Sequence, residues 1–140
     1  MYIQVKIGDF GLARILEQDY YIGEGTLPIK WMPPESLSYG KFSTKSDVWS
    51  FGILTWEIVT IGSRPYEGKE PYEVKEYVIN KGHLEIPKIC HPILHENLLK
   101  CWSFNPADRP SFSTLHSNFE TLWLDLKERS EAETCLSCEF

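Results

Sequence analysis

The sequence predicts a mainly α-helical fold with one short N-terminal strand and a long loop ahead of the helices. Alternating apolar and polar residues over 2–7 predict the strand, with one face buried. Glycines and the Pro33-Pro34 pair then interrupt residues 8–35, where neither a helical nor a strand period persists. From residue 43 onward, apolar residues recur at helical spacing. A loop of this length inside a compact domain is uncommon and is usually functional.

The first expected helix is the most apolar one. Ser43 and Thr44, with Asp47 three places further on, form an N-cap pattern, and Gly62 is a natural helix end. The run 48–61 between them is apolar on almost every side. A helix without a polar face has to be covered all round, so we expect this helix at the centre of the domain.

Three further helices are expected after it. One opens at Pro71 and closes before Gly82, the next opens at Pro92, and the last begins near Phe112. Apolar residues three and four positions apart predict which face of each helix turns inward. These inward positions are Val74, Tyr77, Val78, Leu94, Leu98, Leu99, Trp102, Leu115, Phe119, Leu122 and Leu126. Residues 127–140 are acidic and show no period, and we expect them to be disordered.

Composition excludes several classes of protein. The chain has 14 Lys and Arg against 20 Asp and Glu, a formal net charge of −6. No basic run marks a nucleic-acid or anionic-membrane surface. No apolar stretch approaches the ~20 residues of a membrane span, and the first residues do not form a secretory leader.

Cysteines are few, at positions 90, 101, 135 and 138, and we expect free thiols. Cys135-x-x-Cys138 is half of a zinc or redox pattern. No second paired set of Cys or His accompanies it, so an incidental pair in the tail is the simpler interpretation.

Five motifs occur in a fixed order along the chain. D-F-G (residues 9–11) follows the expected strand, and a carboxylate at a strand tip suits a hard cation such as Mg²⁺. The others are P-I-K-W-M-P-P-E at 28–35, S-D-V-W-S-F-G at 46–52, G-S-R-P-Y at 62–66, and Cys101-Trp102 with Pro106 and Arg109-Pro110. Together they resemble the C-terminal lobe of protein tyrosine kinases over residues 2–124. Asp19-Tyr20-Tyr21 further resembles the insulin-receptor-like receptor tyrosine kinases.

The resemblance implies a domain organisation and a parent activity. Residues 1–126 form a partial kinase domain, with an activation segment at 9–35 and a helical C-lobe at 36–126, and an acidic tail follows at 127–140. The parent enzyme transfers the γ-phosphoryl group of ATP to protein tyrosine in the cytoplasm, as the intracellular part of a membrane receptor.

The resemblance also assigns roles within the activation loop. Asp9 holds Mg²⁺ against the ATP phosphates, and Phe10-Gly11 lets the loop change conformation. Tyr20 and Tyr21 are implied phosphorylation sites, with Arg14 as the nearest cationic partner. The alternative interpretation from the residues alone is that Asp9 is a plain turn former and that the two tyrosines belong to an exposed aromatic loop, but the flanking motifs favour the metal role for Asp9.

Five consecutive residues are assigned to substrate docking by the resemblance: Pro28, Ile29, Lys30, Trp31 and Met32. Glu35 is expected to form a buried ion pair with Arg109, although two unrelated surface charges remain an alternative. Asp47 accepts backbone hydrogen bonds from a catalytic loop in the family, or here only caps its helix. Pro33 stands where the family usually has Ala, and proline removes an N–H donor and holds the preceding residue extended.

Other parts of a protein kinase do not occur in these 140 residues. They are the Gly-rich loop, the strand Lys, the helix Glu and the H-R-D loop. Gly23-x-Gly25 does not replace the first of these, because Pro28 occupies the position of the third glycine. We therefore expect no autonomous kinase activity. ATP and Mg²⁺ are expected to act in the parent kinase and to bind poorly to this segment alone.

By the resemblance, Met1 lies inside the strand that precedes D-F-G in kinases, which favours a truncated product or an incomplete gene model. The central helix would then lack neighbours, and the isolated segment is expected to be marginal in stability or held by a partner. A second hypothesis is a non-catalytic module that keeps the docking surface at 28–32 and 71–80. A third is a small helical interaction domain. The expected partners are protein tyrosine substrates or a complementary kinase lobe, with neither nucleic acid nor a membrane span.

Overall fold

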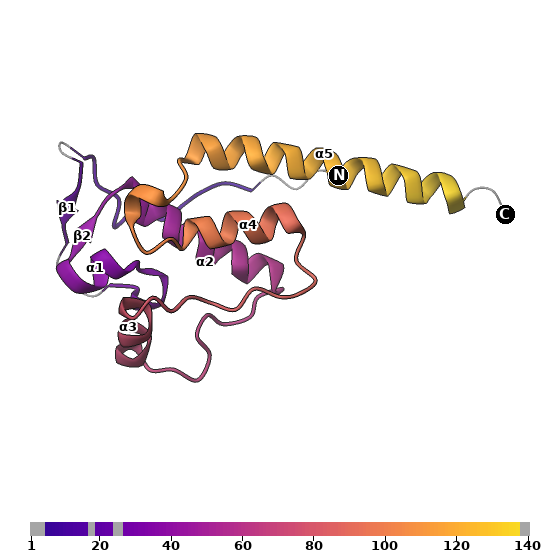
Figure 1. Ribbon diagram of the computed structural model, residues 1–140. Coiled ribbons are helices and arrows are strands. Elements are labelled where there is room, and N and C mark those ends of the chain that lie inside the picture. The colour runs from indigo at the N-terminus through magenta and orange to yellow at the C-terminus, as the bar shows by residue number, and fades with distance from the viewer. Residues whose placement is uncertain (1–4, 17–18, 24–26, 138–140) are drawn as a thin grey trace.

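A computed structural model describes residues 5–16, 19–23 and 27–137 of the chain, with side chains up to residue 130 (Figure 1). The chain is mainly helical, which confirms the predicted fold class. Its elements in order are β1 (Tyr21–Ile22), η1 (Ile29–Trp31), α1 (Pro34–Tyr39), β2 (Lys41–Phe42), α2 (Thr44–Val59), α3 (Pro71–Ile79), α4 (Pro92–Cys101), η2 (Pro106–Asp108) and α5 (Phe112–Ser137). The helix starts expected at Pro71, Pro92 and Phe112 are all found.

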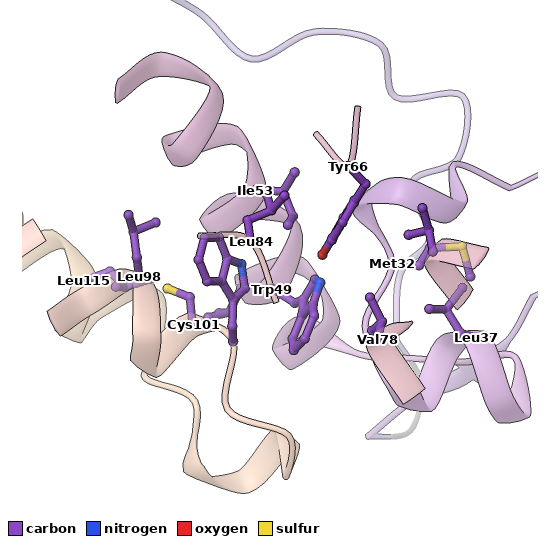
Figure 2. Packing of buried hydrophobic residues seen from close by; sticks show 13 residues of the cluster. Met32, Leu37, Trp49, Ile53, Tyr66, Val78, Leu84, Leu98, Cys101 and Leu115 are labelled. Carbon is purple, nitrogen blue, oxygen red and sulfur yellow. The ribbon is translucent and has the colours of Figure 1, made fainter. Parts of the chain in front are cut away.

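Helix α2 lies between two groups of elements. On one side it packs against α4, which in turn packs against α5. On the other side it contacts η1, which packs against α3, and α3 packs against α1. Figure 2 shows the buried side chains of α2, Trp49 and Ile53, with Leu98 and Cys101 of α4 beside them. Met32, Tyr66 and Val78 extend the same cluster towards the loop and α3. One continuous core therefore joins the long loop to the helices.

Both ends of α2 are fixed by local hydrogen bonds. The Ser43 hydroxyl accepts from the Lys45 N–H at 3.2 Å, and the Ser43 N–H donates to the Ser46 hydroxyl at 3.0 Å. The expected cap is thus present, but Ser46 completes it and Asp47 does not. At the other end the Ile61 N–H donates to the Ile58 carbonyl at 3.1 Å and the Gly62 N–H to the Glu57 carbonyl at 2.8 Å, a Schellman ending.

The strand expected over 2–7 is not found in the part of it that the structure describes. Residues 5–7 have no regular structure and are exposed, while residues 2–4 lie outside the described part. A lone strand is stable only when paired, and no described segment pairs with residues 5–7. The two-stranded sheet lies elsewhere. β1 pairs antiparallel with β2, opposing Tyr21 to Phe42 and Ile22 to Lys41.

Helix α2 is not covered on all sides, in line with the expectation that this helix lacks some of its neighbours in a partial kinase domain. Leu54 is 50% exposed and Ile58 69% exposed, because the described elements contact the opposite side of the helix. Three residues expected to face inward on other helices are also exposed: Tyr77, Leu99 and Leu126. Amphipathic spacing predicts which residues share a face, and neighbouring elements decide how much of that face is covered.

Helix α5 continues to Ser137, where disorder was expected from 127. Residues 127–137 contain neither Gly nor Pro, and Arg129 forms an i,i+4 ion pair with Asp125 at 3.2 Å. Figure 1 shows the second half of α5 extending beyond the other helices. Within the described residues, no helix is both long and apolar enough to cross a bilayer.

Candidate functional site

The D-F-G segment is exposed and carries a single candidate metal ligand. Asp9 has a left-handed backbone, with φ of 60°, and Phe10 is 68% exposed. A turn follows, in which the Ala13 N–H donates to the Phe10 carbonyl at 3.0 Å. The described residues contain no group of three His, Cys, Asp or Glu side chains arranged to hold a metal. One carboxylate on an open loop does not make a Mg²⁺–ATP site, so these residues do not by themselves fit the nucleotide.

The two adjacent tyrosines of the loop have different surroundings. The Lys41 ammonium lies 3.8 Å from the centre of the Tyr20 ring, while Tyr21 stacks on Phe42 at 5.1 Å between ring centres. Arg14 was the cation expected near them. Its guanidinium instead donates to the carbonyls of Ala13 at 2.7 Å and Gly11 at 3.3 Å. The cation that contacts Tyr20 is therefore Lys41.

The segment from Pro28 to Met32 is held firmly against α2. Ile29–Trp31 forms the short helix η1, and Met32 is buried. The Trp31 indole N–H donates to the Glu57 carboxylate at 3.0 Å, and the Ser50 hydroxyl donates to the Trp31 carbonyl at 2.8 Å. Both anchors come from α2, so the shape of this segment depends on that helix.

Lys30 and Pro33 complete this segment. The Lys30 ammonium lies 3.5 Å from the Tyr66 carbonyl, at the edge of hydrogen-bonding distance. Pro33 is buried and acts as the N-cap residue of α1, with an extended backbone that suits proline. The departure from the family pattern at this position is thus accommodated.

Glu35 and Arg109 form a bidentate ion pair. The Arg109 guanidinium donates to the two Glu35 carboxylate oxygens at 2.7 and 2.8 Å, and its side chain is fully buried. It also donates to the Ser103 and Lys45 carbonyls, each at 2.9 Å, and lies over the Trp49 ring. The pair joins the end of the loop to the segment between α4 and α5.

Asp47 lies at the wall of a cavity between the loop and α2. The cavity has a volume of about 470 Å³, and Leu12, Trp31 and Ser50 also line it. Among the described residues the Asp47 carboxylate has no hydrogen-bond partner; the residue keeps an exposed surface, and partial desolvation at the cavity wall raises its pKa. Asp47 thus neither caps its helix nor accepts a backbone hydrogen bond from the described segments.

Sequence reasoning missed several residues of this site. Lys45 donates to the Arg109 carbonyl, and the Ser46 hydroxyl donates to Glu35 at 3.3 Å, so both reinforce the ion pair. In the sequence, Glu57 is a polar interruption in an otherwise apolar helix. That interruption was the available signal, since a carboxylate on a buried helix needs a partner.

The two cysteines whose side chains are described, Cys90 and Cys101, are free thiols. Cys138 and the side chain of Cys135 lie outside the described part, as do Gly25 and the rest of 24–26. The predictions made for them stay predictions.

Comparison with known proteins agrees with these motifs. Residues 2–119 match the family model described as protein tyrosine and serine/threonine kinase. The chain is 46% identical to the protein sevenless of Drosophila melanogaster over 96% of its own length, and 50% identical to the insulin-like growth factor 1 receptor of Xenopus laevis over 83%. It is 47% identical to the human tyrosine-protein kinase ABL2 over 86%. The chain spans 6%, 9% and 10% of those three proteins.

The order of the motifs, the helical architecture and the extent of these matches agree. The chain belongs to the protein tyrosine and serine/threonine kinase family, and corresponds to the C-terminal lobe of a tyrosine kinase from the D-F-G motif onward.

Proposed function

We propose that this chain is the substrate-docking part of a receptor-type tyrosine kinase whose parent transfers the γ-phosphoryl group of ATP to protein tyrosine. The observation that carries the proposal is the anchoring of residues 28–35. Trp31 is bonded to Glu57 and Glu35 to Arg109, so the segment that faces a substrate in this family is held at its middle and at its C-terminal end. A rigid docking segment is what positioning of a tyrosine hydroxyl requires.

The chain supplies only part of the chemistry. Phosphoryl transfer depends on positioning and on charge stabilisation by several groups around the phosphates. Asp9 is the metal ligand in this proposal, and the remaining groups have to come from outside the 140 residues. The chain alone is therefore inactive, and ATP and Mg²⁺ bind in the parent domain.

The names of relatives support the receptor class. One of them is a receptor for an insulin-like growth factor. In this proposal the segment is on the cytoplasmic side of a membrane receptor, and its partners are protein tyrosine substrates and the complementary part of the kinase domain.

A chimera tests the proposal. In an active human ABL2 kinase domain, the matching segment is replaced by the residues of this chain, and phosphorylation of a tyrosine peptide is measured. We expect the chimera to be active and Asp9→Asn to reduce kcat by about a hundredfold or more, because a metal ligand is lost. Asp19→Asn is the matched control, an exposed carboxylate in the same loop. A folded but inactive chimera, or equal effects of the two substitutions, would count against the proposal.

The second candidate is a non-catalytic module that binds substrate peptides without nucleotide. The observation that favours it is that residues 28–32 are anchored although the D-F-G segment is exposed. Titrating the 140-residue chain with a tyrosine peptide in the absence of ATP distinguishes the two. Saturable binding that Trp31→Ala abolishes supports the module.

A further inference from the structure

The pairing of β1 with β2 separates Tyr20 and Tyr21 onto opposite faces. Tyr21 opposes Phe42 and Ile22 opposes Lys41, so Tyr20 lies diagonally across from Lys41 on one face. The other face carries the stacked rings of Tyr21 and Phe42 and lines the cavity beside α2. The phenol of Tyr20 is 39% exposed, with the Lys41 ammonium 3.8 Å from its ring centre.

Lys41 is well placed, and among the described side chains no carboxylate competes for its ammonium group. None of the ion pairs among described side chains includes it. Its backbone is fixed, because the Lys41 carbonyl accepts from the Ser36 hydroxyl at 2.6 Å. Beyond the strands, the Gly23 N–H donates to the Gly40 carbonyl at 3.0 Å. A lysine ammonium on a flexible four-carbon stem can move from a ring face to an anion attached to that ring.

We propose that Lys41 is the counter-ion of a phosphoryl group on Tyr20, and that this contact strengthens the β1–β2 pair. The modification rests on the proposed function. The Tyr20 hydroxyl oxygen forms a bond to the γ-phosphorus of ATP, the bond to ADP breaks, and the phenolic proton passes to a base of the kinase that acts on it. The product carries a charge of about −1.5 to −2 at neutral pH. The weak cation–ring contact thereby becomes an ion pair across the two strands.

Tyr21 does not share this arrangement. A phosphoryl group there lies on the cavity face, where the stack on Phe42 has to open before the group reaches a cation. Arg14 lines that cavity and bonds backbone carbonyls through Nη1 alone, so the cation on that face is Arg14 and not Lys41. Lys41 therefore responds to modification of the first tyrosine and not of the second.

The test uses the 140-residue chain with phosphotyrosine introduced by synthesis at position 20 or 21. A nearby cation favours the doubly charged phosphate, so phosphorus NMR should give phosphotyrosine 20 a titration midpoint about half a pH unit lower than in Lys41→Met. The midpoint at position 21 should not respond to that substitution. Lys75→Met, an exposed lysine on α3, is the matched control. The adjacent Asp19 carboxylate is present both with Lys41 and in Lys41→Met, so its effect on the phosphate titration midpoint cancels in the difference.

Backbone exchange provides a second measurement. Phosphorylation at position 20 should slow exchange of the Gly23 amide hydrogen by about two- to fivefold, and Lys41→Arg should retain this effect while Lys41→Met loses it. Dispersed amide signals from α2 show that each variant is folded. A midpoint and an exchange rate that Lys41→Met leaves unchanged in a folded chain overturn the proposal. Because the phosphate is synthetic, this result is independent of whether the parent kinase is active.

Discussion

The Arg109 guanidinium donates two hydrogen bonds to the Glu35 carboxylate, at 2.7 and 2.8 Å, across 74 positions of sequence. Arg109 is fully buried, and Lys45 and Ser46 at the start of α2 bond to the same pair. Three segments that are distant in sequence therefore meet at one desolvated ion pair. Removing either charge leaves the other buried without its partner.

Arg109→Leu should lower the free energy of unfolding by about 3–5 kcal/mol, because the Glu35 carboxylate is left uncompensated. Urea unfolding followed by circular dichroism measures this. Arg129→Leu is the control, since Arg129 belongs to an exposed ion pair on α5 and should cost less than about 1 kcal/mol. The double variant Glu35→Leu/Arg109→Leu should cost less than the sum of the single ones. Equal losses from Arg109→Leu and Arg129→Leu would contradict this account.

The hydrogen bond between Trp31 and Glu57 predicts a split in kinetic parameters. In the ABL2 chimera, Glu57→Ala removes the acceptor for the Trp31 indole N–H and loosens the docking segment. We expect KM for a peptide substrate to rise by about tenfold, because one hydrogen bond to a charged group is lost, and we expect a smaller change in kcat. Glu67→Ala, an exposed glutamate after α2, is the control. A fall in kcat at unchanged KM would show that Glu57 acts on the transfer step instead.

Much of the helical framework was predictable because its signals are local. Proline at the first turn set the starts of α3 and α4, and Ser43 set the start of α2. The sequence predicted that the central helix would lack neighbours, but not that Leu54 and Ile58 would be the exposed residues, since exposure depends on neighbours and not on the helix itself.

The candidate site divides in the same way. The resemblance to kinases paired Glu35 with Arg109, and no local pattern could have done so across such a separation. The contacts of Trp31 with Glu57 and of Tyr20 with Lys41 depend on how η1 and the short sheet pack. Such packing depends on tertiary contacts, which residue propensity and hydrophobic periodicity do not predict.

Gly52 allows α2 and α4 to approach closely. A Cβ at this position would lie 2.7 Å from the Trp102 indole nitrogen and 2.9 Å from the Cys101 Cβ. Gly52→Ala should destabilise the chain by about 1–3 kcal/mol, because overpacking outweighs the gain of up to about 1 kcal/mol in helix propensity. Gly8→Ala has nothing within 4 Å and should change little. Thermal melting measures both, and a more stable Gly52→Ala variant would show that α4 shifts to make room.

Cys101 should make stability depend on pH in the alkaline range. Burial raises the pKa of its thiol to about 12, although the nearby Arg109 lowers it somewhat. Above about pH 9 the thiol ionises in the unfolded chain and stays protonated in the folded one, so the unfolded state binds fewer protons and stability falls as pH rises. One such group contributes at most about 1.4 kcal/mol per pH unit. Urea unfolding from pH 8 to 11 should show a steeper fall for the natural chain than for Cys101→Ala. Cys90→Ala, at a partly exposed thiol, should flatten the dependence of the unfolding free energy on pH less than Cys101→Ala does. Parallel curves for all three proteins would mean that Cys101 ionises in the folded chain.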